Sequence, residues 1–130
     1  MSEHFLQQWH RMVETRDPAV IAPLIADHAE LRSPAYWRPK KGKEIVLAVC
    51  GAVMSILDNF RYHGEWAEGS ELILLFEGSL EGKTVRGIDR VVLDEEGRLV
   101  ELEVFVRPLS ALTLLAEHMG RHFEGSSART

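Results

Sequence analysis

Apolar positions in the first third of the chain follow the three- and four-residue spacing of amphipathic helices. Asp17 and Pro18 have the pattern of an N-cap followed by a proline at the first helical position, and Pro23 keeps the helix that begins there short. The stripe of the helix before it comprises Phe5, Leu6, Trp9, Met12 and Val13. A third helix is expected from about Lys43, with an inner side of Ile45, Val46, Val49, Val53, Ile56 and Leu57.

From residue 60 the apolar period changes to two, which is typical of β-strands. Alternation over 60–66 predicts one strand, and the near-continuous apolar run 72–80 predicts a central strand covered on both faces. Segments 84–93 and 99–106 predict two more strands, joined by a turn at 94–97. A short strand over 29–33 is stopped by Pro34, and Pro108 opens a final helix.

Helices followed by consecutive strands with short turns predict an α+β fold, with an antiparallel sheet packed on the N-terminal helices and a C-terminal helix. A curved sheet wrapped over helices makes a cone, whose apolar interior is a natural ligand site. The length fits a single domain over residues 1–124 and a flexible tail over 125–130. The expected core includes Trp9, Leu24, Val49, Val53, Leu74, Val91 and Leu112.

The composition of the chain limits the classes of partner that it can bind and the cellular compartment in which we expect it. A formal net charge of −5 argues against the basic footprint that binding to nucleic acid or to a membrane surface requires. Cys50 is the single cysteine, and no stretch approaches the roughly 20 apolar residues of a membrane span. The first ten residues lack the basic flank and long apolar run of a signal peptide. We therefore expect a cytoplasmic protein that binds neither nucleic acid nor membrane.

Asp89 is the leading candidate for a functional group. It shares a strand face with Val85 and Val91, so alternation directs its carboxyl group toward the apolar side. A carboxylate in apolar surroundings needs a partner or a raised pKa, and acids with a raised pKa concentrate at functional sites. The alternative is a structural role, in which Asp89 pairs with Arg107 or Trp9.

Glu77 interrupts the apolar run of the preceding strand. We expect it to pair across the sheet with Arg86 or Arg90. An acid–base pair with Asp89 is the alternative, which requires both carboxyl groups to lie on one face.

Aromatic side chains around the expected cavity suit a flat, apolar ligand, although an ordinary core role is the alternative for each. Trp37 lies beside Tyr36 in a proline-rich loop, where large apolar residues would form a rim or lid. The expected ligand-binding residues are Trp9, Ser33, Trp37, Phe60, Tyr62, Asp89 and Arg107.

Basic residues gather around the same loop: Arg32, Arg38, Lys40, Lys41 and Lys43 are five of the 15 in the chain. They would guide an anionic ligand or form a solvated face. His118 and His122 lie four apart, a spacing that can share a metal ion, but no wider ligand motif accompanies them. We expect no metal site and no cofactor.

Three segments resemble parts of one protein family, in the same order along the chain. Residues 21–34 are similar to its second helix and first strand, 41–44 (Lys-Gly-Lys-Glu) to the start of its third helix, and 87–100 to the hairpin before its last strand. This family is the nuclear transport factor 2-like (NTF2-like) superfamily, which includes ketosteroid isomerases and SnoaL-type polyketide cyclases. The resemblance implies a SnoaL-like domain and a homodimer.

The functional residues of ketosteroid isomerases are matched only in part. Where those enzymes hold an aspartate base before a proline, this chain has Ser33, and where they place a tyrosine donor on the first helix it has Trp9. Their protonated aspartate, a well-known case of a neutral buried acid, corresponds to Asp89. The resemblance therefore implies that a standard isomerase mechanism lacks its base, for which His63 and Asp27 are weak substitutes.

Three functions remain open. The first is binding of a small, largely apolar molecule in the cavity, with Asp89 as the deep polar contact. The second is an isomerase or cyclase that uses Asp89 as general acid or oxyanion donor with an unidentified base. The third is an interaction module that dimerises through the outer sheet face around Ile88 and Val92.

Overall fold

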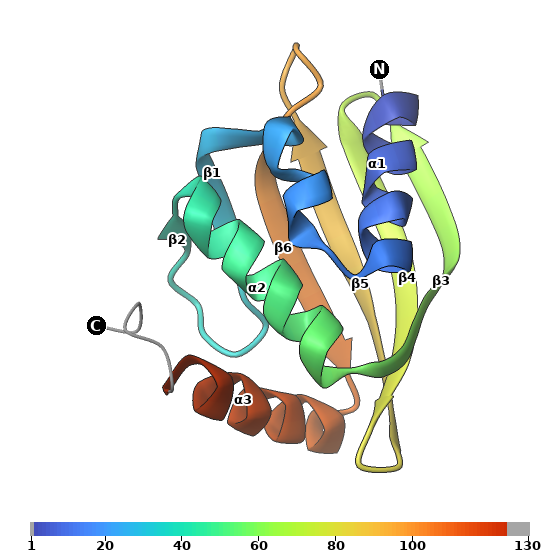
Figure 1. The fold of residues 1–130 in the computed structure, drawn as a ribbon, viewed down its shortest axis with the longest axis vertical. Coiled ribbons are helices and arrows are strands. Elements are labelled where there is room, and N and C mark those ends of the chain that lie inside the picture. The colour runs from blue at the N-terminus through green and yellow to red at the C-terminus, as the bar shows by residue number, and fades with distance from the viewer. Residues whose placement is uncertain (1, 125–130) are drawn as a thin grey trace.

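The computed structural model describes residues 2–124 as helices over a curved sheet (Figure 1). Its helices are α1 (Ser2–Thr15), α2 (Lys43–Ile56) and α3 (Leu109–Glu124), with 3₁₀ turns η1 (Pro18–Val20) and η2 (Ala22–Leu24). Its strands are β1 (Ile25–Arg32), β2 (Lys40–Lys41), β3 (Asp58–Glu68), β4 (Glu71–Leu80), β5 (Lys83–Leu93) and β6 (Leu99–Arg107). The tail predicted over 125–130 lies outside the described residues.

The strands form one six-stranded sheet in the order β2-β1-β6-β5-β4-β3. Strands β3 to β6 make the predicted antiparallel meander, and β2 pairs antiparallel with β1. One pairing corrects the prediction of an antiparallel sheet, because β1 runs parallel to β6. After β1 the chain adds the edge strand β2, passes through α2 and continues at β3 on the opposite edge of the sheet. No hairpin turn therefore joins β1 to β6 or sets their relative direction.

The helices cover one face of the sheet, which confirms the α+β class. In Figure 1, α1 and α2 lie in front of the strands, and α3 crosses their lower end. The amphipathic stripe of α1 buries Phe5, Trp9 and Met12. At the end of α2, the Arg16 guanidinium donates to the carbonyl of Met54, which has no partner within the helix.

The predicted second helix is a pair of 3₁₀ turns. Asp17 accepts a hydrogen bond from the amide of Ala19 at 3.0 Å, and Pro18 begins the first turn. Pro23 lies in the second turn and has no amide hydrogen, so the chain cannot continue there as a regular α-helix. Strand β1 therefore begins at Ile25 and not at residue 29, where the prediction put it.

Side chains of the central strands alternate between an inner face, toward the helices, and an outer face. On β4 and β5 the buried inner positions include Leu72, Leu74, Phe76, Leu80, Val85, Asp89, Val91 and Leu93. Of the expected core, Trp9, Leu74 and Val91 are buried. Only partly buried are Leu24, in the second 3₁₀ turn, and Val49, Val53 and Leu112, which line a cavity.

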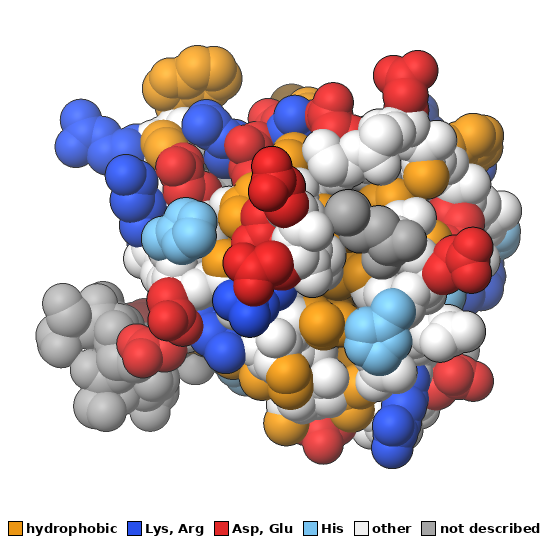
Figure 2. All heavy atoms as spheres, turned by 90° about the horizontal axis from the view of Figure 1, so that it is seen from above, with side chains coloured by type: hydrophobic (Ala, Val, Ile, Leu, Met, Phe, Trp, Pro, Cys, Tyr) orange, Lys and Arg blue, Asp and Glu red, His pale blue; other side chains and the backbone are white. Residues whose placement is uncertain are grey.

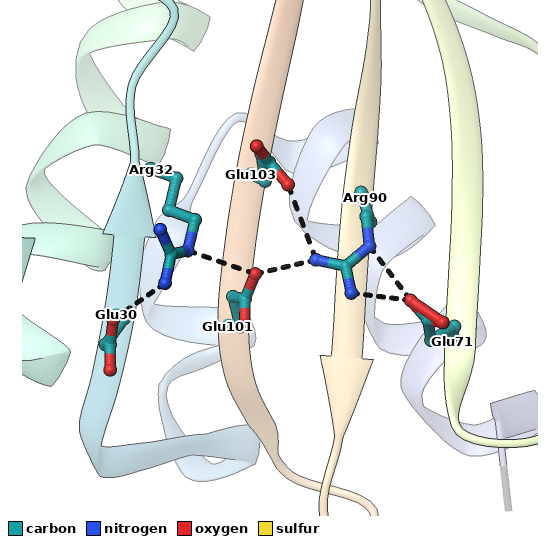
Figure 3. A network of polar contacts seen from close by, with 6 residues as sticks. All are labelled: Glu30, Arg32, Glu71, Arg90, Glu101 and Glu103. Carbon is teal, nitrogen blue, oxygen red and sulfur yellow. Dashed lines mark hydrogen bonds and ion pairs between the residues drawn. The ribbon is translucent and has the colours of Figure 1, made fainter. Parts of the chain in front are cut away.

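The outer face carries a network of ion pairs across four strands (Figure 3). Arg90 Nη1 lies 2.6 Å from Glu101 Oε2, and Arg90 Nη2 lies 2.6 Å from Glu71 Oε2. Arg32 also reaches Glu101, with 3.2 Å between Nε and Oε2. We call this set the outer-face network, and its members are Glu30, Arg32, Glu71, Arg90, Glu101 and Glu103.

The rest of the surface mixes charges of both signs. Figure 2 shows acidic and basic side chains side by side over the face viewed from above, without an extended field of one sign. Within residues 2–124, no helix has the length and apolar character to cross a membrane.

Candidate functional site

A cavity of about 650 Å³ lies between the inner face of the sheet and the helices. Its volume is within the range of small-molecule sites. Apolar side chains from every helix line it, among them Met12, Val49, Val53, Met54, Leu112, Leu115, Met119 and Phe123. The loop between β1 and β2 closes one side with Ser33, Pro34, Ala35 and Tyr36.

Three residues from separate elements form a hydrogen-bonded chain in this cavity. The indole Nε1 of Trp9, on α1, donates to the hydroxyl oxygen of Tyr62, on β3, at 2.7 Å. The Tyr62 hydroxyl donates to Asp89 Oδ2, on β5, at 2.9 Å. An indole can only donate, so the Tyr62 oxygen accepts from Trp9, and the one hydroxyl hydrogen of Tyr62 is donated to the carboxyl group.

This direction determines where Asp89 holds its own proton. Oδ2 accepts from Tyr62, whereas Oδ1 has no hydrogen-bond partner among the described residues. No fully buried side-chain oxygen or nitrogen atom in the described residues lacks a partner, so Oδ1 is not completely shielded from solvent. Asp89 lines the cavity, which is where Oδ1 is accessible. When Asp89 is neutral, its proton therefore belongs on Oδ1, from where it can be donated to an oxygen atom of a bound molecule.

Burial dominates the electrostatics of the site. It raises the pKa of Asp89 from 3.8 to about 7, and the hydrogen bond from Tyr62 opposes that rise only in part. Burial, followed by the charge of Asp89, also raises the pKa of Tyr62 well above its ordinary value and that of Cys50 to about 12. Cys50 is thus an unreactive thiol, and Asp89 is the cavity group that titrates near neutral pH.

An aromatic wall stands beside the carboxyl group. The rings of Phe60 and Phe76 are stacked with centroids 5.2 Å apart, and Tyr62 meets Phe60 edge-on at 5.2 Å. Phe76 has room because its neighbour across the sheet is Gly87, where a Cβ atom would lie 2.5 Å from the Phe76 ring and 2.2 Å from the Phe105 carbonyl oxygen. The missing side chain at Gly87 therefore positions this wall.

The structure brings together five of the seven residues expected to bind a ligand: Trp9, Ser33, Phe60, Tyr62 and Asp89 all line the cavity. Part of the hydrogen-bonding capacity of Ser33 is already used, since its Oγ accepts a hydrogen bond from the amide of Ala35 at 3.0 Å. The other two residues lie elsewhere. Trp37 is 92% exposed and borders a separate surface hollow, and Arg107 is exposed at the end of β6 beside Arg86, so neither lines the cavity.

The partner of Asp89 differs from the expected ones. Arg107 does not contact it, and Trp9 reaches it only through Tyr62, whose hydroxyl the prediction did not use. Alternation with Phe60 indicates from the sequence that Tyr62 points inward. Its meeting with Asp89 depends on pairing across β4 and on two register shifts in β3, which the sequence pattern does not show.

Glu77 belongs to the opposite face of the sheet, which excludes an acid–base pair with Asp89. Its carboxylate lies 2.6 Å from Arg61 Nη2 and 3.4 Å from His63 Nε2, so the predicted pairing with Arg86 or Arg90 is wrong. Strand β3 supplies these partners, because it pairs with β4 on the side away from β5.

Neither weak candidate for a general base reaches the cavity. His63 lies on the outer face against Glu77, and Asp27 is exposed on β1. Among residues 2–124 no three histidine, cysteine or acidic side chains are grouped as metal ligands, and His118 pairs with Glu81 at 2.6 Å.

Solved structures share this architecture over almost the whole chain. A steroid delta-isomerase from Pseudomonas aeruginosa is 32% identical, with a TM-score of 0.92 over 98% of this chain and 94% of that one. A bacterial protein with a cystatin-like fold from Silicibacter pomeroyi is 26% identical, with a TM-score of 0.90 over 99% of this chain and 90% of that one. An NTF2-like protein of unknown function from Mesorhizobium loti, 17% identical with a TM-score of 0.73 over 82% and 91% of the two chains, shares the fold alone.

No protein-family model and no curated protein matches the chain. The structural match to the isomerase covers 98% of the chain and therefore includes the helices, the curved sheet and the segments that form the cavity. The fold supports a ligand-binding or isomerase-type scaffold, without indicating a specific ligand or reaction. The chain belongs to the NTF2-like superfamily.

Proposed function

We propose that the protein binds a small, largely apolar molecule in its cavity and donates a hydrogen bond from Asp89 Oδ1 to an oxygen atom of that molecule. The observation that carries this proposal is the chain from Trp9 through Tyr62 to Asp89, which ends in a buried carboxyl group within an apolar lining. The aromatic wall of Phe60 and Phe76 suits a flat ring system.

The raised pKa of Asp89 supports donation over acceptance below neutrality. With a pKa of about 7, the carboxyl group is largely neutral at pH 6 and largely charged at pH 8. A ligand carbonyl oxygen accepts from the neutral acid but is repelled by the carboxylate. Affinity for a ketone should therefore fall as pH rises through 7.

The test uses 6-propionyl-2-dimethylaminonaphthalene, a neutral fluorescent ketone whose emission reports hydrogen bonding. At pH 6 we expect Asp89→Ala to weaken its binding about fivefold or more, which is the value of one buried hydrogen bond. Asp89→Asn keeps a donor and should bind within about threefold of the wild type. Glu77→Gln is the matched control, because it removes a carboxylate from the other face of the sheet. Equal affinity of the Ala, Asn and wild-type proteins at pH 6 and pH 8 would refute the role of Asp89.

Steroid isomerisation is the second candidate, favoured by the 32% identity to a steroid delta-isomerase and by the acid at Asp89. What is missing is a base: apart from Asp89, the acid in the described cavity lining is Glu44, which is exposed. Loss of a general base costs about 10²–10⁴-fold in rate. We therefore expect the wild type to convert a 5-ene-3-oxosteroid far more slowly than a competent isomerase, as followed by ultraviolet absorbance of the conjugated product.

Ser33→Asp sharpens that test, because Ser33 lines the cavity where the resemblance puts the base. The substitution should raise the isomerisation rate by about 10²-fold, and adding Asp89→Asn should reduce it again. A wild-type rate that Ser33→Asp leaves unchanged would show that another residue transfers the proton.

We also propose that the protein forms a homodimer through the outer face. This face exposes Trp66 and Phe105, at 59% and 49%. Beyond Phe105, the adjacent Arg86 and Arg107 pair with no acid among the described residues, whereas the outer-face network holds four glutamates and two arginines. A twofold arrangement would bring the two arginines of one copy to the acidic end of the other. Phe105→Glu should convert a dimer to a monomer in sedimentation velocity, and a monomeric wild type would refute the proposal.

A further inference from the structure

Charged side chains are few on the cavity side of the sheet. In the register of β1 and β2, Lys40 lies opposite the buried Leu31, on the cavity side. Lys41 lies opposite Glu30 and so belongs to the outer face. The rim of the described lining is therefore left with Lys40 and the exposed Glu44, one charge of each sign. This rim favours neither anions nor cations, so the interior decides which ligand charge is accepted.

The interior contains one group that is charged near neutral pH. Among the cavity-lining residues that the structure describes, Asp89 is the buried acid. Tyr62 and Cys50 are also buried there, and burial raises the pKa of each far enough to keep it neutral at pH 7. The remaining titratable groups of this lining are exposed: Tyr36, Lys40, Lys41 and Glu44. The charge inside the cavity is thus zero or negative, depending on Asp89.

The surroundings of Asp89 support a carboxylate without neutralising it. The Tyr62 hydroxyl, which accepts from the Trp9 indole, donates to Oδ2. The neighbours of Asp89 across the sheet, Leu74 on β4 and Val104 on β6, are apolar. No basic side chain within residues 2–124 pairs with this carboxyl group, and its Oδ1 is free to accept. A cation that enters the cavity would supply the missing charge.

The aromatic wall beside this carboxyl group also favours a cation. Phe60 and Phe76 are stacked, and the edge of Tyr62, which bonds to Asp89, meets the Phe60 ring. The faces of aromatic rings carry negative charge density and attract an ammonium group, most strongly where water is excluded. The same rings provide a flat apolar surface for the hydrocarbon part of a ligand.

We propose that the cavity also binds a protonated apolar amine, whose ammonium group donates a hydrogen bond to Asp89 Oδ1 while its apolar body lies along the aromatic wall. This inference rests on the proposed cavity binding and adds a second ligand class, which the carboxylate form of Asp89 accepts. The folded protein already contains the buried carboxylate, so an ammonium group forms a charged hydrogen bond and compensates a charge that has no other ionic partner. A carboxylate ligand of the same shape is repelled.

Isothermal titration calorimetry with three naphthalenes of similar shape tests the ligand charge separately from the cavity. The three are 2-naphthylmethylamine, which carries an ammonium group, 2-naphthalenemethanol, which is neutral, and 2-naphthoate, which is an anion. At pH 8 the amine should bind about tenfold more tightly than the alcohol, which is the value of a buried hydrogen bond to a charged partner. The naphthoate should bind most weakly.

The pH dependence gives a second readout. Between pH 6 and pH 8 the affinity for the amine should rise about tenfold, because the charged fraction of Asp89 rises as pH passes its pKa of about 7. This trend is opposite to the one expected for the neutral ketone. At pH 6, binding of the amine should release close to one proton, measured as a dependence of the heat on the ionisation enthalpy of the buffer.

Two variants locate the ammonium group. Asp89→Asn should weaken binding of the amine about tenfold at pH 8 and abolish its pH dependence, while changing binding of the alcohol by less than about threefold. Glu44→Gln is the matched control, because it removes an exposed acid from the same lining, and it should change the affinity for the amine by less than about threefold. Equal losses in the two variants would place the ammonium group at the rim and overturn the inference.

The outcomes separate this inference from the proposed function. If the amine and the alcohol bind alike at pH 8 while the neutral ketone depends on Asp89, the amine class is wrong and the proposed function stands. If the amine behaves as expected but the ketone does not depend on Asp89, donation to an oxygen atom is refuted and the amine site remains. If neither the naphthalenes nor the ketone bind, both proposals fail.

Discussion

The two faces of the central sheet hold their charged groups in opposite conditions, one residue apart on the same strand. Arg90, on the outer face of β5, contacts three carboxylates, from Glu71, Glu101 and Glu103. Asp89, on the inner face, has one polar partner among the described residues, the neutral hydroxyl of Tyr62. The positive charge of Arg90 is thus balanced by several carboxylates, whereas the charge of Asp89 is offset only by one neutral hydrogen-bond donor.

This difference separates groups that hold the fold together from a group that costs stability. In the single protomer water reaches the outer-face network, so its ion pairs form with little desolvation and tie β1, β4, β5 and β6 together. Asp89 is 7% exposed, and no cation within residues 2–124 pairs with its charge. A buried acid without an ionic partner destabilises the native state whenever it is charged, and such costs are retained where function requires them.

The largest expected effect is the pH dependence that Asp89 imposes on stability. Its pKa is about 7 in the folded protein and 3.8 in the unfolded chain, so the folded state binds more protons between these values. The free energy of unfolding should therefore fall as pH rises from about 4 to 7, by up to about 4 kcal/mol, and this contribution should be constant on either side. Asp89→Asn removes it, so the variant should gain stability relative to the wild type across that range.

Urea unfolding of both proteins at pH 4, 6 and 8 measures this difference. Subtracting the two curves removes the titration of every other group that the substitution leaves untouched. Glu77→Gln, on the outer face of the neighbouring strand, is the control and should not reproduce the widening gap. A difference that stays constant with pH would show that Asp89 titrates near its ordinary value and that the inner face is not apolar at this point.

The next largest effect is expected from Gly87→Ala, which tests how the inner face makes room for the aromatic wall. The new Cβ would lie 2.2 Å from the Phe105 carbonyl oxygen and 2.5 Å from the Phe76 ring, so backbone and ring must both move. We expect a loss of about 2–3 kcal/mol in urea unfolding and weaker probe binding. Gly120→Ala in α3 meets nothing within 4 Å and should be neutral or stabilising. Equal stabilities for the two variants would contradict the packing described here.

Arg90→Met should have a smaller effect, confined to the outer face. It leaves Glu71, Glu101 and Glu103 without their shared partner, at a cost of about 1–2 kcal/mol in low salt. The cost should shrink in 1 M sodium chloride because the pairs are accessible to water. Affinity for the neutral ketone should not change, and a change of more than about threefold would mean that the two faces are coupled.

Most of the fold follows from hydrophobic periodicity. The change from helical to two-residue spacing predicted α2, α3 and the strands of the meander, since burial of one face dictates each pattern. The elements whose structure differs from the prediction depend on factors other than hydrophobic periodicity. Pro23 overrode a helical pattern by removing a backbone donor. The direction of β1 relative to β6 is set by a crossover connection that leaves no mark in the sequence.

The candidate site was also predictable as far as strand alternation reaches, but not where loops or strand register decide the contacts. Strand alternation placed Asp89 on the apolar side, and the same rule applied to β6 would have turned Arg107 outward, opposite to Val106. Trp37 lies in a loop, where no periodicity restricts the direction of a side chain. The contact between Tyr62 and Asp89 joins strands that are not neighbours, so it depends on register and curvature that only the folded sheet defines.

The smallest expected effect concerns this contact. Tyr62→Phe removes the hydrogen bond that favours the charged form of Asp89, so the pKa of the carboxyl group should rise above 7. One hydrogen bond of about 1 kcal/mol corresponds to roughly 0.7 pH unit. The carbon chemical shift of the Asp89 carboxyl group, followed from pH 3 to 9 in both proteins, measures the displacement. A pKa lowered by the substitution would mean that Tyr62 accepts a hydrogen bond from the neutral carboxyl group of Asp89 instead of donating one to it. The indole of Trp9 would then not set the direction of the chain, and Oδ1 would not be the atom that meets the ligand.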